Sequence, residues 1–219
     1  MFTCVDGKHF GLLFVNPTAM EIYLIRHTTP LVEKGTCYGQ ADLDVTESFK
    51  EEAACILPHL PSRIEHVVSS PLKRCRKLAQ FLFPKNTIQY DDRIKEIHCG
   101  HWELQPWDLI DRQHLDPWMA DVVNVQIPGG ESYVQLHQRV VHFFEEVTKS
   151  YSSLAIVAHG GVLRSLLAHI NGVQLKESFD QFTIRYGCVV KVHISNNRLC
   201  HAILHNPETP QEQHRPSYY

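Results

Sequence analysis

Two short apolar runs constrain what this chain can fold into, because each ends abruptly in a histidine. Residues 22–25 are followed by Arg26 and His27, and residues 154–158 are followed by His159 and two glycines. If both runs form neighbouring parallel strands, their carboxyl ends meet at one edge of a sheet, where ligands bind in open α/β folds. The sequence therefore predicts that the two imidazoles share one pocket.

A third apolar run, residues 66–70, leads directly into a basic segment. Ser70 can cap a helix whose first position is Pro71, which places Arg74 in the first turn or so. A helix N-terminus carries free amide groups and a positive dipole end, so Arg74 and the helix favour the same ligand charge. This segment predicts an anion as the ligand.

Strand-length runs alternate along the chain with segments of helix length, the pattern of βαβ units. We therefore expect an α/β fold, a three-layer α/β/α sandwich with a mostly parallel central sheet. The predicted elements are strands at 21–26, 65–69, 87–90 and 153–158, helices at 48–60, 71–83, 131–149 and 161–171, a polar loop at 27–47, a Trp-rich insertion at 91–128 with only short helices, and a hairpin at 181–204 that turns at Asn196-Asn197.

Length and composition favour one domain. The chain has 219 residues and 43% hydrophobic content, which suits a single large core. We expect that domain to span residues 20–205, preceded by an N-terminal extension at 1–19 and followed by a flexible tail at 206–219. The extension holds Asp6, Lys8 and His9 and has only a short apolar patch before Met20, so it is a poor signal peptide. No apolar run reaches the roughly 18 residues of a membrane span.

Charge and cysteine content narrow the partners and the compartment. The 21 basic residues nearly balance the 24 acidic ones, so the sequence predicts no nucleic-acid partner. The seven cysteines are odd in number and never form a Cys-x-x-Cys pair, which favours free thiols in a reducing cytoplasm. We expect a cytoplasmic enzyme for a small molecule, without a membrane partner, as a monomer or homodimer.

The predicted pocket suits a phosphate ester. A phosphomonoester carries about −1.5 to −2 charge near neutral pH, and Arg26, Arg74 and a protonated His159 would bind it. An imidazole with a pKa of about 6.5 has a free lone pair at neutral pH, which makes His27 the candidate nucleophile. A carboxylic acid must then protonate the departing oxygen.

Four segments in this order resemble the histidine phosphatase superfamily, also called phosphoglycerate mutase-like: residues 26–27, 69–74, 96–103 and 159–161. The resemblance implies that fold and a phosphohistidine on His27. It also implies that Glu96 is the proton donor and later the base, and that no metal or other cofactor takes part. The phosphoryl group would be held by Arg26, Arg74, His159, Gly160 and Thr28.

The loop at residues 35–45 is similar to the Tyr-Gly-Gln-x-Asp loop of alpha-ribazole phosphatases, which makes Tyr38 and Gln40 candidate substrate-loop residues. This resemblance implies hydrolysis of alpha-ribazole 5′-phosphate in assembly of the nucleotide loop of cobalamin. The chain departs from the family pattern at two positions, where Thr28 and Leu104 stand in place of glycine.

Several alternatives stay open at this point. Within enzymes, a phosphoglycerate mutase or a broad-specificity small-molecule phosphatase has the same pocket residues, and a non-catalytic phospholigand-binding protein is the alternative from another class. Glu103 and Glu131 compete with Glu96 as the acid. A metal site at His98, His101 and His114 is another alternative, although we favour ordinary surface or loop histidines. Trp102, Trp107 and Trp118 could form a wall for a substrate base, although we favour simple packing of the insertion.

Overall fold

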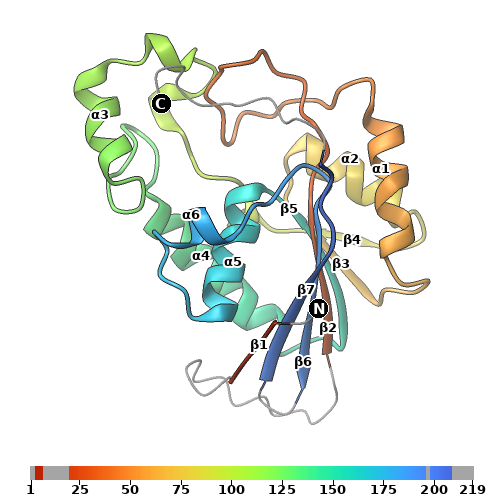
Figure 1. Cartoon of the computed structure of the whole chain (residues 1–219). Coiled ribbons are helices and arrows are strands. Elements are labelled where there is room, and N and C mark those ends of the chain that lie inside the picture. The colour runs from red at the N-terminus through yellow and green to blue at the C-terminus, as the bar shows by residue number, and fades with distance from the viewer. Residues whose placement is uncertain (1–2, 7–19, 196–197, 209–219) are drawn as a thin grey trace.

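The computed structural model describes residues 3–6, 20–195 and 198–208. Within these residues one seven-stranded sheet has the order β1-β7-β6-β2-β5-β3-β4 (Figure 1). Five of the strands, β2, β3, β4, β5 and β7, point the same way, so the sheet is mostly parallel as predicted. The strands are β1 Thr3–Asp6, β2 Met20–Arg26, β3 His66–Ser69, β4 Ile88–Tyr90, β5 Ser153–Ala158, β6 Val189–Ser195 and β7 Arg198–His205.

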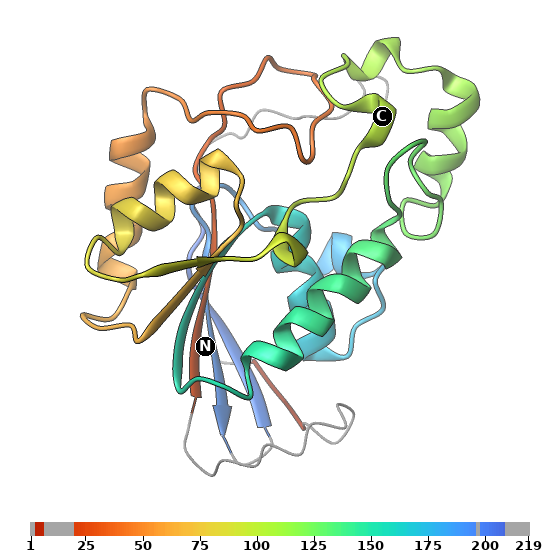
Figure 2. The same cartoon turned by 180° about the vertical axis from the view of Figure 1, so that it is seen from behind.

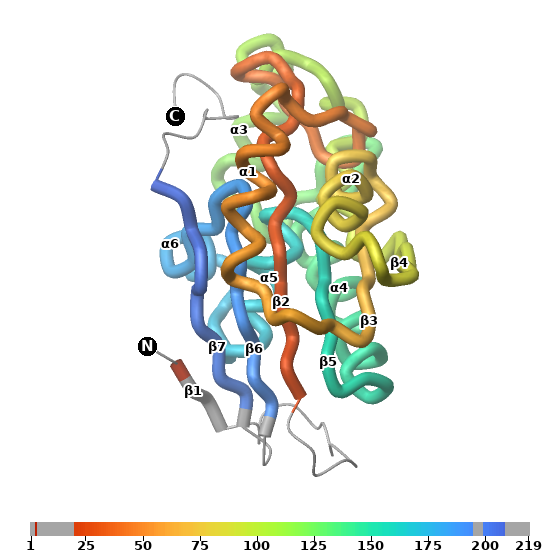
Figure 3. The backbone as a smooth tube through the Cα atoms, turned by 90° about the vertical axis from the view of Figure 1, so that its right-hand side faces the viewer, coloured from red at the N-terminus to blue at the C-terminus, as the bar shows by residue number. Residues whose placement is uncertain are grey.

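Helices cover both faces of the sheet, which confirms the three-layer arrangement (Figures 2 and 3). Helices α1 and α2 pack on one face, and α4, α5 and α6 pack on the other. The helices are α1 Phe49–Ile56, α2 Lys73–Leu82, α3 Arg112–Ala120, α4 Tyr133–Val147, α5 Gly160–Asn171 and α6 Ser178–Gln181, with short 3-10 turns at Leu57–His59, Asp92–Ile94, Gly100–Trp102 and Trp107–Leu109.

The alternation of side chains along β2 explains why two cores form. Ile22 and Leu24 point into the core beneath α4 and α5, whereas Tyr23 and Ile25 point into the core beneath α1 and α2. Successive strand residues face opposite sides of a sheet, so an unbroken apolar run is the pattern of a strand buried on both faces. This strand therefore lies in the middle of the sheet and carries His27 to its centre.

Local signals set the ends of the long helices. Helix α4 begins with a capping box in which Ser132 and Gln135 satisfy each other's free amides. Helix α5 ends at Gly172, whose φ of +64° is a conformation that glycine adopts easily. The predicted cap of α2 is wrong, because the helix begins at Lys73 after Leu72, with no side-chain cap.

Other differences from the sequence predictions lie near the termini. Strand β1 precedes Met20 and pairs antiparallel with β7. Helix α6 ends at Gln181, the first residue of the predicted hairpin, and the first hairpin strand, β6, begins only at Val189. The hairpin itself is present as β6 and β7, while its Asn196-Asn197 turn, most of the extension (7–19) and the tail from 209 lie outside the described residues.

The insertion has its own small core and no long helix, as predicted. Its buried residues are Cys37, Cys99, Trp102, Trp107, Ile110, Leu115 and Ile127, so this cluster also anchors the loop that follows β2. Backbone bonds join the two segments, with Cys37 donating to Gln105 and Leu104 donating to Cys37. The loop after β2 and the insertion therefore form one wall above the sheet.

The cysteines divide into two kinds. Five are free thiols, namely Cys37, Cys55, Cys75, Cys99 and Cys188. Cys200 is disulfide-bonded, so the prediction of free thiols is wrong at that position. No helix in the described part of the chain is long and apolar enough to cross a bilayer. The same residues contain no group of three or more His, Cys, Asp or Glu side chains arranged to hold a metal ion.

Candidate active site

The structure brings the predicted basic and histidine side chains to one edge of the sheet. Arg26 pairs in register with Ala158, and Ser69 pairs with Val157, so β2, β3 and β5 end at the same level. The rings of His27 and His159 lie 5.1 Å apart, centroid to centroid, in an edge-on arrangement. The two imidazoles thus share one pocket, as the strand pattern predicted.

Two hydrogen bonds fix the tautomer of His27. Its Nδ1 lies 2.7 Å from the carbonyl oxygen of Thr28, and because a carbonyl only accepts, Nδ1 must carry the proton. Its Nε2 lies 3.3 Å from Nε of Arg74, which only donates, so Nε2 carries the lone pair. Burial first, and then the charges of Arg74 and Arg26, hold the pKa of His27 well below its ordinary value. The ring is a neutral nucleophile with a defined attacking atom.

Arg74 is fully buried and is held by the loop that follows β2. Its two terminal nitrogens donate to the carbonyl oxygens of Ala41, at 2.9 Å, and Gly39, at 2.6 Å. These bonds leave Nε directed at His27. A phosphate oxygen at this point would compete for the Arg74 proton and free the lone pair of His27.

His159 caps α5 and is buried against Ser70. Its Nε2 lies 2.8 Å from the Ser70 hydroxyl oxygen, and the Cys75 thiol lies 3.5 Å from the same nitrogen. Burial, followed by the charges of Arg74, His27 and Arg26, holds the pKa of His159 well below its ordinary value. This lowered pKa favours the neutral form of His159, so the fixed positive charge of the site comes from the two arginines. A protonated His159 in contact with a phosphate group stays a prediction.

Arg26 lies between the sheet edge and the start of α5. Its guanidinium stacks 4.0 Å from the ring centre of Tyr186, and one nitrogen donates to the carbonyl of Ile184. A Cβ on Gly160 would lie 3.1 Å from the guanidinium carbon, which is tighter than ordinary contact. Gly160 thus allows Arg26 to lie close to the positive end of the helix.

Glu96 is the carboxylate that faces this site. Its Oε1 accepts from its neighbour Ile97 at 2.9 Å, and its Oε2 accepts from the Gly161 amide at 3.0 Å. A Cβ on Gly161 would overlap Oε1, so this position requires glycine. The Glu96 side chain is thus held at the start of α5, where Gly161 is the second residue of the helix.

The two competing carboxylates have other partners. Glu103 accepts from the backbone amides of Gly39, Gln40, Ala41 and Cys99, and so ties the loop after β2 to the insertion. Glu131 forms an ion pair with Arg139 and accepts from the His98 amide. Neither lines the cavity described next, whereas Glu96 does.

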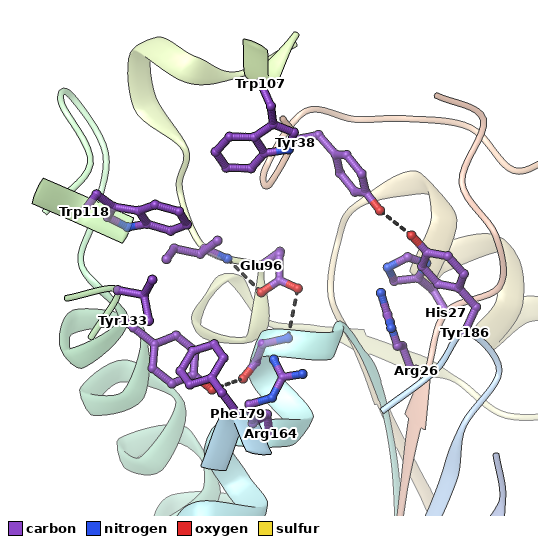
Figure 4. A pocket seen from close by; sticks show the side chains of 13 residues that line it. Arg26, His27, Tyr38, Glu96, Trp107, Trp118, Tyr133, Arg164, Phe179 and Tyr186 are labelled. Atoms are coloured by element: carbon purple, nitrogen blue, oxygen red, sulfur yellow. Dashed lines mark hydrogen bonds between the residues drawn. The ribbon is translucent and has the colours of Figure 1, made fainter. Parts of the chain in front are cut away.

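A cavity of about 370 Å³ opens beside His27 (Figure 4). In that view Arg26, His27 and Tyr186 stand on one side of it, and Tyr133, Phe179 and Arg164 stand on another. Trp107 and Trp118 stack at 5.7 Å and line the wall, while Trp102 packs behind them in the insertion core. The lining residues are Arg26, His27, Tyr38, Glu96, Ile97, Trp107, Trp118, Val122, Tyr133, Gly161, Arg164, Phe179 and Tyr186.

The predicted substrate-loop residues differ in position. Tyr38 lines the cavity, and its hydroxyl lies 2.7 Å from that of Tyr186. Gln40 instead donates its side-chain amide to the backbone carbonyl of Glu96, outside the lining. Thr28 is fully buried, its hydroxyl has no hydrogen-bond partner, and it is absent from the lining.

Sequence reasoning missed Arg139, Tyr186 and Phe179. The Arg139 guanidinium donates to the carbonyls of Arg93, Lys95 and Glu96, which fixes the loop that carries the acid. The sequence contains a signal for Arg139, because it lies seven positions, or about two turns, after Ser132 and so shares a helix face with the start of α4. Tyr186 comes from the irregular segment before β6 and Phe179 from the four-residue helix α6, and neither has a comparable pattern.

Comparisons with known proteins agree with this geometry. The sequence model of the histidine phosphatase superfamily (branch 1) matches residues 22–206. The metal-independent phosphoserine phosphatase of Arabidopsis thaliana is 30% identical over 169 residues, covering 71% of each chain. The adenosylcobalamin/alpha-ribazole phosphatase of Escherichia coli is 27% identical over 186 residues, covering 80% of this chain and 91% of that one.

A solved structure extends the likeness to the fold. The alpha-ribazole phosphatase from Shigella flexneri superposes with a TM-score of 0.75 at 24% identity, over 84% of this chain and 95% of that one. The fold, the motifs and the family match all cover the same part of the chain. The chain is an enzyme of the histidine phosphatase superfamily, branch 1.

Proposed function

We propose that this enzyme hydrolyses phosphomonoesters through a phosphohistidine on His27. The single observation that carries the proposal is the lone pair on His27 Nε2, held at the end of β2 by the Thr28 carbonyl and facing Arg74. Two guanidinium groups, Arg26 and Arg74, balance the charge of about −2 on the phosphate. The start of α5 adds its dipole.

The chemistry needs two proton transfers. In the first step a bond forms between Nε2 of His27 and phosphorus, the ester P–O bond breaks, and Glu96 gives its proton to the departing oxygen. In the second step the oxygen of a water molecule bonds to phosphorus and the N–P bond breaks. Glu96 takes the water proton, which restores both residues.

His159, Gly160 and Thr28 have supporting roles in this proposal. A phosphate dianion next to His159 would favour its protonated form, so it would become a donor once the ligand is present. Gly160 admits Arg26 to the helix start. Thr28 holds the His27 tautomer through its carbonyl, and its side chain is fully buried.

Two substrates are candidates. Alpha-ribazole 5′-phosphate is supported by the loop resemblance, by a relative of that name and by the stacked Trp107 and Trp118, which offer a face for an aromatic base. Phosphoserine is supported by other relatives and by Arg164, a cation in the same cavity. A place in cobalamin assembly follows only from the first candidate, whereas the predicted cytoplasmic location rests on the cysteine content of the sequence.

The test is product analysis in ¹⁸O-labelled water. With either substrate we expect inorganic phosphate that carries one labelled oxygen, because water attacks phosphorus in the second step. With 3-phosphoglycerate, formation of 2-phosphoglycerate instead of phosphate would identify a mutase. Phosphate binding without any turnover would identify a non-catalytic protein. A chelator should leave the rate unchanged, because the proposed steps use only side chains.

A further inference from the structure

Arg164 places a second positive charge in the cavity, away from the phosphate. It follows Gly160 by four residues on α5, so the two positions lie on the same face of the helix, about one turn or 5.4 Å apart. Figure 4 shows it with Phe179 and Tyr133, across the cavity from His27 and Arg26. Arg164 therefore faces the part of a substrate that leaves.

This guanidinium has no acidic partner among the residues that the structure describes. Its carbon lies 4.9 Å from the ring centre of Phe179, and its Nε is buried without a hydrogen-bond acceptor. Arg93 and Arg139, by contrast, each pair with at least one carboxylate. Arg164 is partly buried, and a ligand with a negative charge can supply the counter-charge that this cation lacks among the described residues.

The lining of this cavity has more unpartnered donors than free acceptors among the described residues. The indole nitrogens of Trp107 and Trp118, which line the wall, are also buried without acceptors. The nearby acceptors are already used, because Glu96 accepts two backbone amides. The Tyr133 hydroxyl donates to the carbonyl of Gly161. A carboxylate, which only accepts, fits this imbalance.

We propose that Arg164 binds a carboxylate on the leaving group, so that the substrates are phosphomonoesters of small hydroxy or amino acids. The inference rests on the proposed function of the same site. The separation of about one helical turn suits a phosphate and a carboxylate joined by two or three carbons. Arginine's planar fork matches both carboxylate oxygens. Alpha-ribazole 5′-phosphate has no such group and would leave Arg164 unpaired.

The test compares O-phosphoserine with its carboxamide, which has the same leaving oxygen and no negative charge beyond the phosphate. The wild-type enzyme should have a kcat/KM at least about tenfold higher for the acid, since a charged hydrogen bond is worth about that factor. Arg164→Met should lower kcat/KM for the acid by about 10–100-fold and change the amide by less than about threefold. Arg164→Lys should restore part of the preference.

The matched control is Arg63→Met, which removes an exposed arginine outside the cavity and should leave both rates unchanged. If the Met variant is unstable in a thermal unfolding assay, Arg164→Gln gives the same comparison with a polar side chain. Equal slowing of acid and amide, or a wild-type preference for the amide or for alpha-ribazole 5′-phosphate, overturns the inference alone. Failure to release phosphate from any ester overturns the proposed function as well.

Discussion

The two ends of the cavity are held in different ways. At the phosphate end, His27, Arg74 and His159 are buried at strand or helix termini, and a hydrogen bond fixes each one. Arg26 Nε and the Thr28 hydroxyl at that end also lack a partner among the described residues, but Arg26 is still held by the Ile184 carbonyl and the Tyr186 ring. At the leaving-group end, Trp107, Trp118 and Arg164 carry buried polar atoms that have no partner in the described part of the chain. The comparison teaches that the reacting groups are positioned before a ligand arrives, while the selecting groups await one.

The largest effect should come from the nucleophile. His27→Asn should lower kcat by about 10⁴-fold or more, because the variant loses the imidazole lone pair that faces Arg74 and is proposed to attack phosphorus. Steady-state phosphate release measures it. His137→Asn, on α4 outside the cavity, is the matched control and should retain the wild-type rate. Comparable activity in both variants would break the distinction between the two ends.

The next effect concerns the acid. Glu96→Gln should lower kcat by about 10²–10⁴-fold with a much smaller change in KM, because the amide cannot transfer the proton. Its single oxygen still accepts from one of the two backbone amides that hold Glu96. Glu51→Gln, on the exposed side of α1, is the control. If Glu103→Gln lowered kcat by a similar factor and Glu96→Gln did not, Glu103 would be the acid instead.

Acid should destabilise the phosphate end. The folded-state pKa values of His27 and His159 lie well below that of an unfolded histidine, about 6.5. The unfolded chain therefore binds more protons below pH 6.5, so stability is full above that pH and falls as the pH drops. Between pH 7.5 and 5.5 these two groups should remove about 3 kcal/mol of unfolding free energy.

Urea unfolding at the two pH values measures this loss. The double variant His27→Asn/His159→Asn removes both titrating groups and should lose about 3 kcal/mol less than the wild type over the same interval. An equal pH dependence in the two proteins would mean that other groups, such as His169 with its pKa lowered to about 4 by burial, account for the acid sensitivity.

Gly161 contacts Glu96 in the lining of the cavity. Gly161→Ala should lower kcat by about 10–100-fold, because the new Cβ overlaps Oε1 of Glu96 and displaces the acid. Gly160→Ala is the matched comparison, and it should cost less because its Cβ would lie 3.1 Å from the Arg26 guanidinium, whereas the Cβ at Gly161 would lie 2.3 Å from Glu96 Oε1. A larger loss of kcat in Gly160→Ala would show that the rate depends more on the position of Arg26 than on that of Glu96.

The smallest effect lies in the insertion. Leu104 has a φ of +64°, a left-handed conformation that strains an L side chain, and its side chain is 56% exposed. Leu104→Gly should therefore raise the unfolding free energy by about 1 kcal/mol and leave kcat unchanged. Thermal unfolding measures it. Destabilisation would mean that the exposed leucine makes a contribution that outweighs the strain.

The same contrast explains what the sequence could predict. The apolar runs before His27 and His159 fix two strand ends, and parallel strands bring such ends together, so the phosphate end was predictable from local pattern. Tyr186 reaches the cavity from an irregular segment, and Phe179 and Arg164 reach it from helices α6 and α5. Arg139 contacts the loop that carries Glu96 from α4, so all four positions depend on tertiary contacts. The ligand-free charge of His159 also depends on burial, which a motif does not report.

The central claim is that His27 becomes covalently phosphorylated. Rapid quenching of the enzyme with a ³²P-labelled phosphomonoester, followed by peptide mapping, tests it directly. We predict acid-labile, base-stable label on the peptide that contains His27, and none in the His27→Asn variant. Label on another residue, or phosphate release in a single turnover with no labelled enzyme at any time point, would contradict the account.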